Sequence, residues 1–255
     1  MSDFNTHNPF HLGDNLVSLH LLRGLAKANP TKHFTHHVLT DYLNQLQPVI
    51  NDLNNLALKP LGQAPPDSKN LWKNHDQWFG HQANRYHFSS FTLDFNRKLA
   101  SEMGLVSPFE KPSDLLLDYP ALQRTVWDGA EFDVLVINSA PMSGQFRNYT
   151  DHQGGYFNPM LYRLVDKGLR VAATRYSGVP GVRYTPPLSI TEIGNLATRS
   201  KVIVGVATGP MWCCLNVWAK PEKFILCLDC NETFDIAPNI VHADSVVAAM
   251  REMRL

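Results

Sequence analysis

The chain has 255 residues, 23 basic and 23 acidic side chains, and 44% hydrophobic residues, and its formal net charge at pH 7 is zero. This apolar content with no net charge excludes a chain that is disordered throughout. The missing net positive charge also argues against nucleic acid as a partner. At about 150 residues per domain, the length fits one large domain or two small ones.

Location can also be predicted from the composition. No run of apolar residues is long enough for a transmembrane helix, and the start MSDFNTHNPFHLGD lacks the charged and then apolar regions of a signal peptide. Four cysteines are too few for a disulfide scaffold in a chain of this length. We therefore expect a soluble cytoplasmic protein, which leaves peripheral contact with a membrane open.

The first half of the chain predicts an α/β domain. Leu16, Leu19, Leu22 and Leu25 recur at helical spacing, so residues 16–28 predict an amphipathic helix that follows a turn at residues 11–15. A further helix is expected at residues 91–103, and residues 41–51 predict a helix interrupted by Pro48. The expected strands are residues 4–7, 34–39 and 56–58.

The second half alternates strands and helices more clearly, which favours parallel βαβ units. Ser189 and Glu192 form the pattern of a capping box, which predicts a helix start. The expected strands are residues 133–138, 169–174, 186–188, 201–206 and 223–228, and the helices are residues 157–167, 190–198, 243–250 and one that starts at 211. We predict a domain boundary that gives residues 1–128 and 129–255.

The segment Ala207-Thr208-Gly209-Pro210-Met211 is a candidate anion site. It follows a buried strand and opens a helix, so it lies at the carboxyl end of a parallel strand. Gly209 permits close approach of a ligand, and Pro210 suits the first helical turn. The free N–H groups of that turn and the Thr208 hydroxyl suit a phosphate. The alternative is an ordinary strand-to-helix turn.

Gly13-Asp14-Asn15 is the second candidate. A carboxylate at a helix start is usually a cap, but one that faces a cleft can act as a general base. His11 is close in sequence and either serves as the base itself or tunes Asp14, since histidine titrates near neutral pH. The residues alone leave these roles open.

Together, the two motifs resemble the GT-B glycosyltransferases of the heptosyltransferase type, glycosyltransferase family nine. The matching stretches are HLGDNLVSLHLLRGLAKANP at residues 11–30 and LSITEIGNLATRSKVIVGVATGPM at residues 188–211. The resemblance covers about the first thirty residues and most of residues 131–228. It implies an α/β fold of two Rossmann-like domains that face a cleft, in a compact version.

This resemblance implies an enzyme that transfers a hexosyl or heptosyl group from a nucleotide-sugar to a hydroxyl acceptor, with inversion and without a metal or other cofactor. The acceptor, a glycan or a lipopolysaccharide-like carbohydrate, would bind the N-terminal domain beside Gly13 and Asn15. Asp14 would be the catalytic base, with His11 beside it. The nucleotide-sugar donor would bind the C-terminal domain.

The donor site that the resemblance implies has two parts. Thr208, Gly209, Pro210 and Met211 would hold the leaving diphosphate. The loop from Ser139 to Gln145, with Ser143, would add hydroxyl and N–H donors. An arginine should neutralise the leaving group, and the candidates are Arg147, Arg175 and Arg183, with Arg175 placed in the donor site.

Two positions depart from the family pattern Asp-Thr-Gly-Pro-x-His, because Ala207 replaces the aspartate and Trp212 replaces the histidine. They motivate an alternative from another class, a catalytically silent protein that binds a nucleotide or a sugar. A sugar-nucleotide epimerase or hydrolase is the alternative among enzymes.

A zinc site is a weaker alternative. Cys227-x-x-Cys230 and the adjacent Cys213 and Cys214 supply four thiols. However, Cys227 lies in an apolar strand, and an adjacent pair is awkward for tetrahedral ligation. We expect free thiols and no metal.

Overall fold

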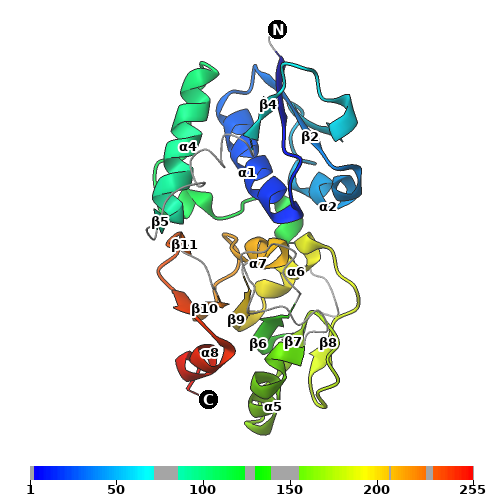
Figure 1. The fold of residues 1–255 in the computed structure, drawn as a ribbon, viewed down its shortest axis with the longest axis vertical. Coiled ribbons are helices and arrows are strands. Elements are labelled where there is room, and N and C mark those ends of the chain that lie inside the picture. The colour runs from blue at the N-terminus through cyan, green and yellow to red at the C-terminus, as the bar shows by residue number, and fades with distance from the viewer. Residues whose placement is uncertain are drawn as a thin grey trace. The chain divides into compact units, whose positions relative to one another are not determined.

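The structure is a computed structural model that describes residues 3–71, 86–123, 130–138, 155–206, 208–227 and 232–254. The chain forms two compact units, residues 1–121 with 233–236 and residues 122–232 with 237–255. We call them unit 1 and unit 2. Each contains a parallel β-sheet with helices (Figure 1). The predicted boundary at residues 128 and 129 lies outside the described residues.

Unit 1 is built on a four-stranded parallel sheet with the order β3-β2-β1-β4. Its strands are β1 (Asp3–His7), β2 (His33–Val38), β3 (Leu56–Pro60) and β4 (Lys69–Asn70), and its helices are α1 (Leu12–Ala28), α2 (Leu43–Leu46) and α4 (Phe88–Glu102). The leucine stripe of α1 is fully buried, as its spacing predicts. Because β2 and β4 pair with opposite edges of β1, the strand order reverses direction at β1.

The helix α1 begins earlier than the sequence predicts. Residues 11–15 were expected to be a turn before the helix, but His11 is the N-cap and Asp14 lies in the first helical turn. Two buried amides stabilise this start. Asn8 accepts a hydrogen bond from the Phe10 N–H (2.9 Å) and donates one to Ser18 Oγ (3.0 Å), and Asn15 donates to the carbonyls of Phe10 and His11. These hydrogen bonds satisfy polar groups of the segment that connects β1 to α1, so the helix begins directly after this segment.

Unit 2 is built on a six-stranded sheet with the order β12-β10-β9-β6-β7-β8, and every strand pair is parallel. Its strands are β6 (Phe132–Ile137), β7 (Val171–Ala173), β8 (Arg183–Tyr184), β9 (Ser200–Val206), β10 (Lys223–Cys227) and β12 (Ile240–Ala243). Its helices are α5 (Asn158–Asp166), α6 (Ile190–Ala197), α7 (Gly209–Cys214) and α8 (Val246–Glu252). This is the Rossmann order, and it reverses direction between β6 and β9.

Close packing fixes the two central strands and the helix that follows them. A Cβ atom on Gly205 of β9 would lie 2.7 Å from the carbonyl oxygen of Ile137 at the end of β6. A Cβ atom on Gly194 of α6 would lie 2.6 Å from the Cys213 carbonyl of α7. Asn216 is 1% exposed, and its amide donates to the carbonyls of Gly194 and Cys213. β9 therefore packs closely against β6, and the end of α7 packs closely against α6.

Two strands of unit 2 differ from the prediction. The expected strand at residues 186–188 is wrong, because β8 is Arg183–Tyr184; Pro186 and Pro187 have no N–H group for a β-ladder. The strand β12 was not predicted, and it adds an edge to the sheet before α8. The capping box at Ser189 is confirmed, since Ser189 N–H donates to Glu192 Oε2 (2.7 Å) and Glu192 N–H donates to Ser189 Oγ (3.3 Å).

A short segment from the second half of the sequence belongs to unit 1. The strand β11 (Glu232–Thr233) pairs with β5 (Tyr86–His87). The Asp235 carboxylate accepts hydrogen bonds from Ser89 N–H (2.8 Å) and Ser89 Oγ (2.7 Å), and Phe234 stacks on Phe88. Asp235 thus caps the start of α4 from a distant part of the chain. Among the described residues, no helix is both long and apolar enough to cross a bilayer.

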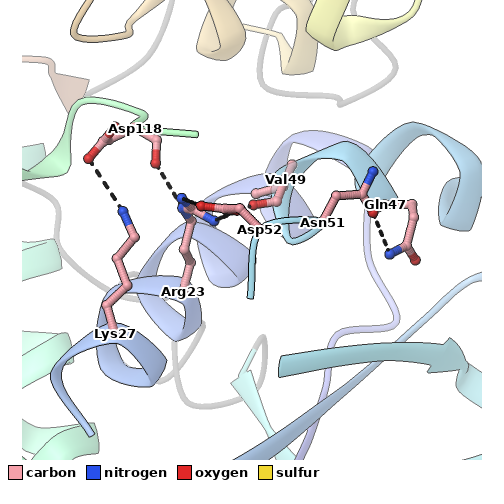
Figure 2. Close-up of polar contacts among 7 residues, drawn as sticks. All are labelled: Arg23, Lys27, Gln47, Val49, Asn51, Asp52 and Asp118. Carbon is pink, nitrogen blue, oxygen red and sulfur yellow. Dashed lines mark hydrogen bonds and ion pairs between the residues drawn. The ribbon is translucent and has the colours of Figure 1, made fainter. Parts of the chain in front are cut away.

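A buried arginine joins three parts of unit 1 (Figure 2). The Arg23 side chain on α1 is 2% exposed and forms a two-pronged ion pair with Asp52, in which Nη2 donates to Oδ2 at 2.6 Å. It also donates to the carbonyls of Val49 (2.9 Å) and Asp118 (2.8 Å). The hydrogen bonds from Arg23 lower the pKa of Asp52. The neighbouring pair of Lys27 and Asp118 is exposed and 3.5 Å long.

These two ion pairs provide a matched test of buried and exposed charge. We expect Asp52→Ala to lower the free energy of unfolding by about 3 kcal/mol, because a buried guanidinium loses its carboxylate. Lys27→Met should change it by less than about 1 kcal/mol, since an exposed pair contributes little. Urea unfolding followed by circular dichroism measures both. Equal effects of the two substitutions would contradict the structural role of Arg23.

Burial strongly lowers the pKa of two histidines in unit 1, His36 and His20. Burial lowers the pKa of His36 to about 3, helped by the nearby His37 and His7, and its Nδ1 lies 2.9 Å from Thr6 Oγ1. Burial lowers the pKa of His20 to about 4, although a contact with the Asp114 carbonyl opposes the change. Both values lie below the ordinary histidine pKa of about 6.5. The unfolded chain therefore binds protons at these positions at a higher pH than the folded chain does.

This difference predicts acid sensitivity. As pH falls from about 6.5 towards 4, each buried histidine should remove about 1.4 kcal/mol of unfolding free energy per pH unit. Above pH 7 both contribute their full stabilisation. Urea unfolding at pH 7, 6 and 5 tests this dependence. His36→Gln should lower the slope of unfolding free energy against pH by about the contribution of one histidine. His33→Gln, at an exposed position, should leave this slope unchanged.

Candidate active site

Three predicted donor residues, Arg175, Thr208 and Gly209, follow strands at the carboxyl edge of the unit 2 sheet. Open α/β sheets bind ligands outside the carboxyl ends of the strands, where the strand order reverses. That position lies between β6 and β9. Asn138 follows β6, and Thr208 and Gly209 follow β9. The two sequence segments proposed for the donor therefore continue from the two strands that flank this point.

Asn138 holds in place the residues that follow the neighbouring strand, β7. It is 1% exposed, and its Nδ2 donates to the Arg175 carbonyl at 2.8 Å. Its Oδ1 accepts from the Arg175 N–H at 2.8 Å and from Thr174 Oγ1 at 3.3 Å. Both peptide groups of Arg175 are thus held from β6. The Arg175 guanidinium is exposed and makes no hydrogen bond or ion pair within the described residues.

Arg183, the other described arginine candidate, is placed differently. Its guanidinium carbon lies 6.0 Å from the ring centroid of Phe132, the first residue of β6. Phe132 marks the amino end of β6, whereas Arg175 stands at the carboxyl end of β7. Of the two, Arg175 is the one at the edge where an anion would bind. Arg147 lies outside the described residues.

Thr208 has a feature that an ordinary N-cap lacks. It precedes α7 with an extended backbone, but its side chain makes no capping hydrogen bond. Its Oγ1 is buried and has no partner in the described part of the chain. The first turn also leaves the N–H groups of Gly209 and Met211 without intrahelical acceptors. Because a buried hydroxyl without a partner is costly, an anionic oxygen bound here would satisfy it.

The carboxyl edge of unit 1 carries the predicted acceptor-side residues. His11, Gly13 and Asp14 are partly exposed in the cap and first turn of α1, directly after β1. The His11 ring lies edge-on to Phe10, with centroids 4.4 Å apart. Asn15 is fully buried and holds the preceding loop. These residues stand where the strand order of unit 1 reverses, as the donor residues do in unit 2.

The described thiols are buried. Cys213 and Cys214 lie on α7 and Cys227 on β10. Burial raises the pKa of Cys227 to about 12 and raises that of Cys214 well above its usual range. In the described ranges, no group of three His, Cys, Asp or Glu side chains could hold a metal ion. Cys230 lies outside these ranges.

Some predicted donor residues are not described by the structure: Ser139, Ser143, Gln145 and Ala207. Asn138 was not predicted as a site residue, although an asparagine directly after a buried strand is a visible signal in the sequence. Tyr176, the residue after Arg175, was not predicted either. The structure thus adds a supporting residue and an exposed aromatic ring to the donor edge.

Comparison with solved structures finds the same fold in heptosyltransferases. The chain is similar to the E. coli heptosyltransferase WaaC with ADP-2-deoxy-2-fluoro heptose, at 13% identity over 99% of both chains and a TM-score of 0.57. A glycosyl transferase family 9 protein from Veillonella parvula matches at 11% identity, over 99% of this chain and 89% of that chain, with a TM-score of 0.53.

A third match is the dodecameric iron-containing glycosyltransferase TibC from enterotoxigenic E. coli. Its identity is 16%, its TM-score is 0.54, and the match covers 94% of this chain and 63% of that chain. No family model matches the sequence, and no curated protein matches it either. The likeness is one of fold. It confirms the two Rossmann-like units of the heptosyltransferase-type GT-B fold that the sequence predicts.

The two arginines give a matched test of the anion site. We expect Arg175→Gln to weaken binding of inorganic pyrophosphate about fivefold, or about 1 kcal/mol, because an exposed cation at the edge is lost. Arg183→Gln should leave the affinity unchanged. Isothermal titration calorimetry at low salt measures both dissociation constants. A larger effect of Arg183→Gln would place the anion elsewhere.

Proposed function

We propose that this protein is a glycosyltransferase that moves a sugar from a nucleotide-sugar to a hydroxyl of a carbohydrate acceptor. One observation carries the proposal. In each unit, a residue predicted for the chemistry follows a strand at which the strand order reverses: Asp14 comes after β1, and Thr208 comes after β9. The fold shared with heptosyltransferases supports the same reading, since those proteins use this architecture.

The donor diphosphate would bind unit 2. Thr208 Oγ1 and the N–H groups of the first α7 turn would donate to its oxygens, and Arg175 would balance its charge. As the bond to the sugar breaks, negative charge grows on the leaving diphosphate. Groups that are already fixed in place stabilise this charge without reorganisation. Asn138 holds the backbone of Arg175 in place, and Asn216 holds the end of α7.

The acceptor would bind unit 1 beside Gly13 and Asn15, and Asp14 would act as the general base. Its carboxylate takes the proton of an acceptor hydroxyl while that oxygen attacks the anomeric carbon. The bond from this carbon to the diphosphate oxygen breaks, and the nucleoside diphosphate leaves with the electron pair. Attack opposite to the leaving group inverts the anomeric centre. His11 in the same helical cap would assist Asp14.

We further propose that the reaction needs no metal, because Arg175 and the α7 start would balance the charge of the diphosphate. TibC is described as iron-containing, so the point needs its own test. Treatment with EDTA should leave turnover unchanged. A loss of turnover that iron or magnesium restores would contradict metal independence without affecting the other steps.

The role of Asp14 can be tested by substitution. Asp14→Asn should lower kcat by about 10²–10⁴-fold, because general-base catalysis contributes that much, and should leave nucleoside diphosphate affinity within about twofold. Donors can be screened from ADP-heptose onwards, since WaaC was solved with an analogue of that sugar nucleotide. Asp41→Asn, at an exposed position of the same unit, is the control.

The outcomes separate the alternatives. Full turnover in Asp14→Asn would remove Asp14 as the base. Nucleoside diphosphate binding without turnover of any donor would favour a silent binding protein, the alternative motivated by Ala207 and Trp212. Release of free sugar without transfer would favour a hydrolase.

A further inference from the structure

Tyr176 is an exposed aromatic ring held in a fixed place. It is 73% exposed, the highest value among the large hydrophobic side chains of the described residues. Its ring lies edge-on to Tyr184 of β8, with centroids 4.8 Å apart and planes at 62°. A lone exposed aromatic residue is common on protein surfaces. This one is distinguished by the contacts that fix the loop carrying it.

The loop from Thr174 to Val182 is tied at both ends. Asn138 holds the peptide groups of Arg175 directly before Tyr176. Beyond it, the Tyr184 hydroxyl accepts from the Val179 N–H (2.7 Å), donates to the Val179 carbonyl (3.2 Å) and lies 3.2 Å from Ser177 Oγ. A preorganised aromatic ring loses little conformational freedom when a ligand stacks on it.

The position of the loop in the sheet suggests its ligand. In a Rossmann sheet, the end of the second strand is where the ribose of a nucleotide is read, usually by a carboxylate. Here the second strand is β7, and residues 174–185, TRYSGVPGVRYT, contain two arginines and no acidic residue. The loop offers a cation and an aromatic face instead.

The spacing of the strands fits a nucleotide. β7 lies two strands from β9, which is about 10 Å at ordinary strand spacing. A diphosphate bound at Thr208 and Gly209 would therefore have its nucleoside directed across β6 towards β7. The ribose and one phosphate group of a nucleotide together span about this distance. Arg175 directly precedes Tyr176 in the chain, so a nucleotide on this ring would have a cation beside it.

We propose that Tyr176 is the stacking surface for the base of the nucleoside diphosphate portion of the donor, with Tyr184 as the support that fixes its ring. The proposal rests on the proposed function, since it takes the donor to be a nucleotide-sugar. It assigns base binding to the loop after β7, and it separates this contact from the diphosphate contacts at α7. Stacking tolerates different bases, because every base has an aromatic face.

Calorimetry with two probes tests the assignment. ADP, GDP and UDP carry a base, and inorganic pyrophosphate does not. Tyr176→Ala should raise the dissociation constant of the best-bound nucleoside diphosphate about tenfold and leave that of pyrophosphate unchanged. Tyr176→Phe should bind like the wild type, because the aromatic face is kept. Tyr162→Ala, at an exposed tyrosine of α5, is the control.

Three results would overturn the proposal. Nucleoside diphosphate binding that is equal in wild type and Tyr176→Ala removes the stacking role and leaves the proposed function standing. If Tyr176→Ala weakens the binding of the nucleoside diphosphate and of pyrophosphate equally, the substitution has displaced Arg175 rather than removed a base contact. This result also removes the stacking role. If the wild type binds pyrophosphate but no nucleoside diphosphate, the nucleotide-sugar donor fails, and this assignment fails with it.

Discussion

The reversal of strand order at the first strand of each sheet is the constraint on which the candidate sites depend. In a parallel sheet, crossover helices cover the two faces. Where successive crossover connections run in the same direction, they also cover the carboxyl ends of the strands. At β1, and again between β6 and β9, the connections diverge in opposite directions. The carboxyl ends of these strands are left open to a ligand. Asp14 follows one such strand, and Thr208 follows the other.

Buried asparagines hold backbone segments of both units in a defined geometry. Asn8, Asn15, Asn138 and Asn216 are each at most 1% exposed. Asn8 and Asn138 follow β1 and β6, Asn15 lies in the first turn of α1, and Asn216 follows α7. An amide both donates and accepts, so one side chain can tie two peptide groups. Asn138 does this for Arg175, and Asn216 does it for the turn after α7. The amides of Asn8, Asn138 and Asn216 both donate and accept, which offsets the cost of burying them, whereas Asn15 donates twice but its Oδ1 has no partner within the described residues.

The sequence predicts the parts of the fold that depend on local pattern. The leucine stripe of α1, the capping box at Ser189 and the apolar strands of unit 2 follow from spacing and residue type, and the structure contains them. The start of α1 was misplaced, because its stability comes from Asn8 and Asn15, which act through tertiary contacts. The strand β12 was missed because IVHA is too short to show a period. At the site, Thr208 could be predicted from its position after a strand. Only the structure shows that its hydroxyl has no hydrogen-bond partner within the described residues. Only the structure places Arg175, and not Arg183, at the carboxyl edge of the sheet.

The supports of the two half-sites are separate, and this separation has a chemical consequence. The residues that fix Asp14, namely Asn8, Ser18 and Asn15, all belong to unit 1, which also buries Arg23, His20 and His36. The residues that hold the Arg175 backbone and the end of α7 all belong to unit 2. Under the proposed function, nucleotide affinity would report on unit 2, whereas turnover would require both units to be intact. Acid lowers the stability of unit 1 through His20 and His36, because the unfolded chain takes up protons at these positions at a pH where the folded chain keeps both side chains neutral. Activity should then be lost at a higher pH than nucleotide binding, and a joint loss would indicate that the two units unfold as one.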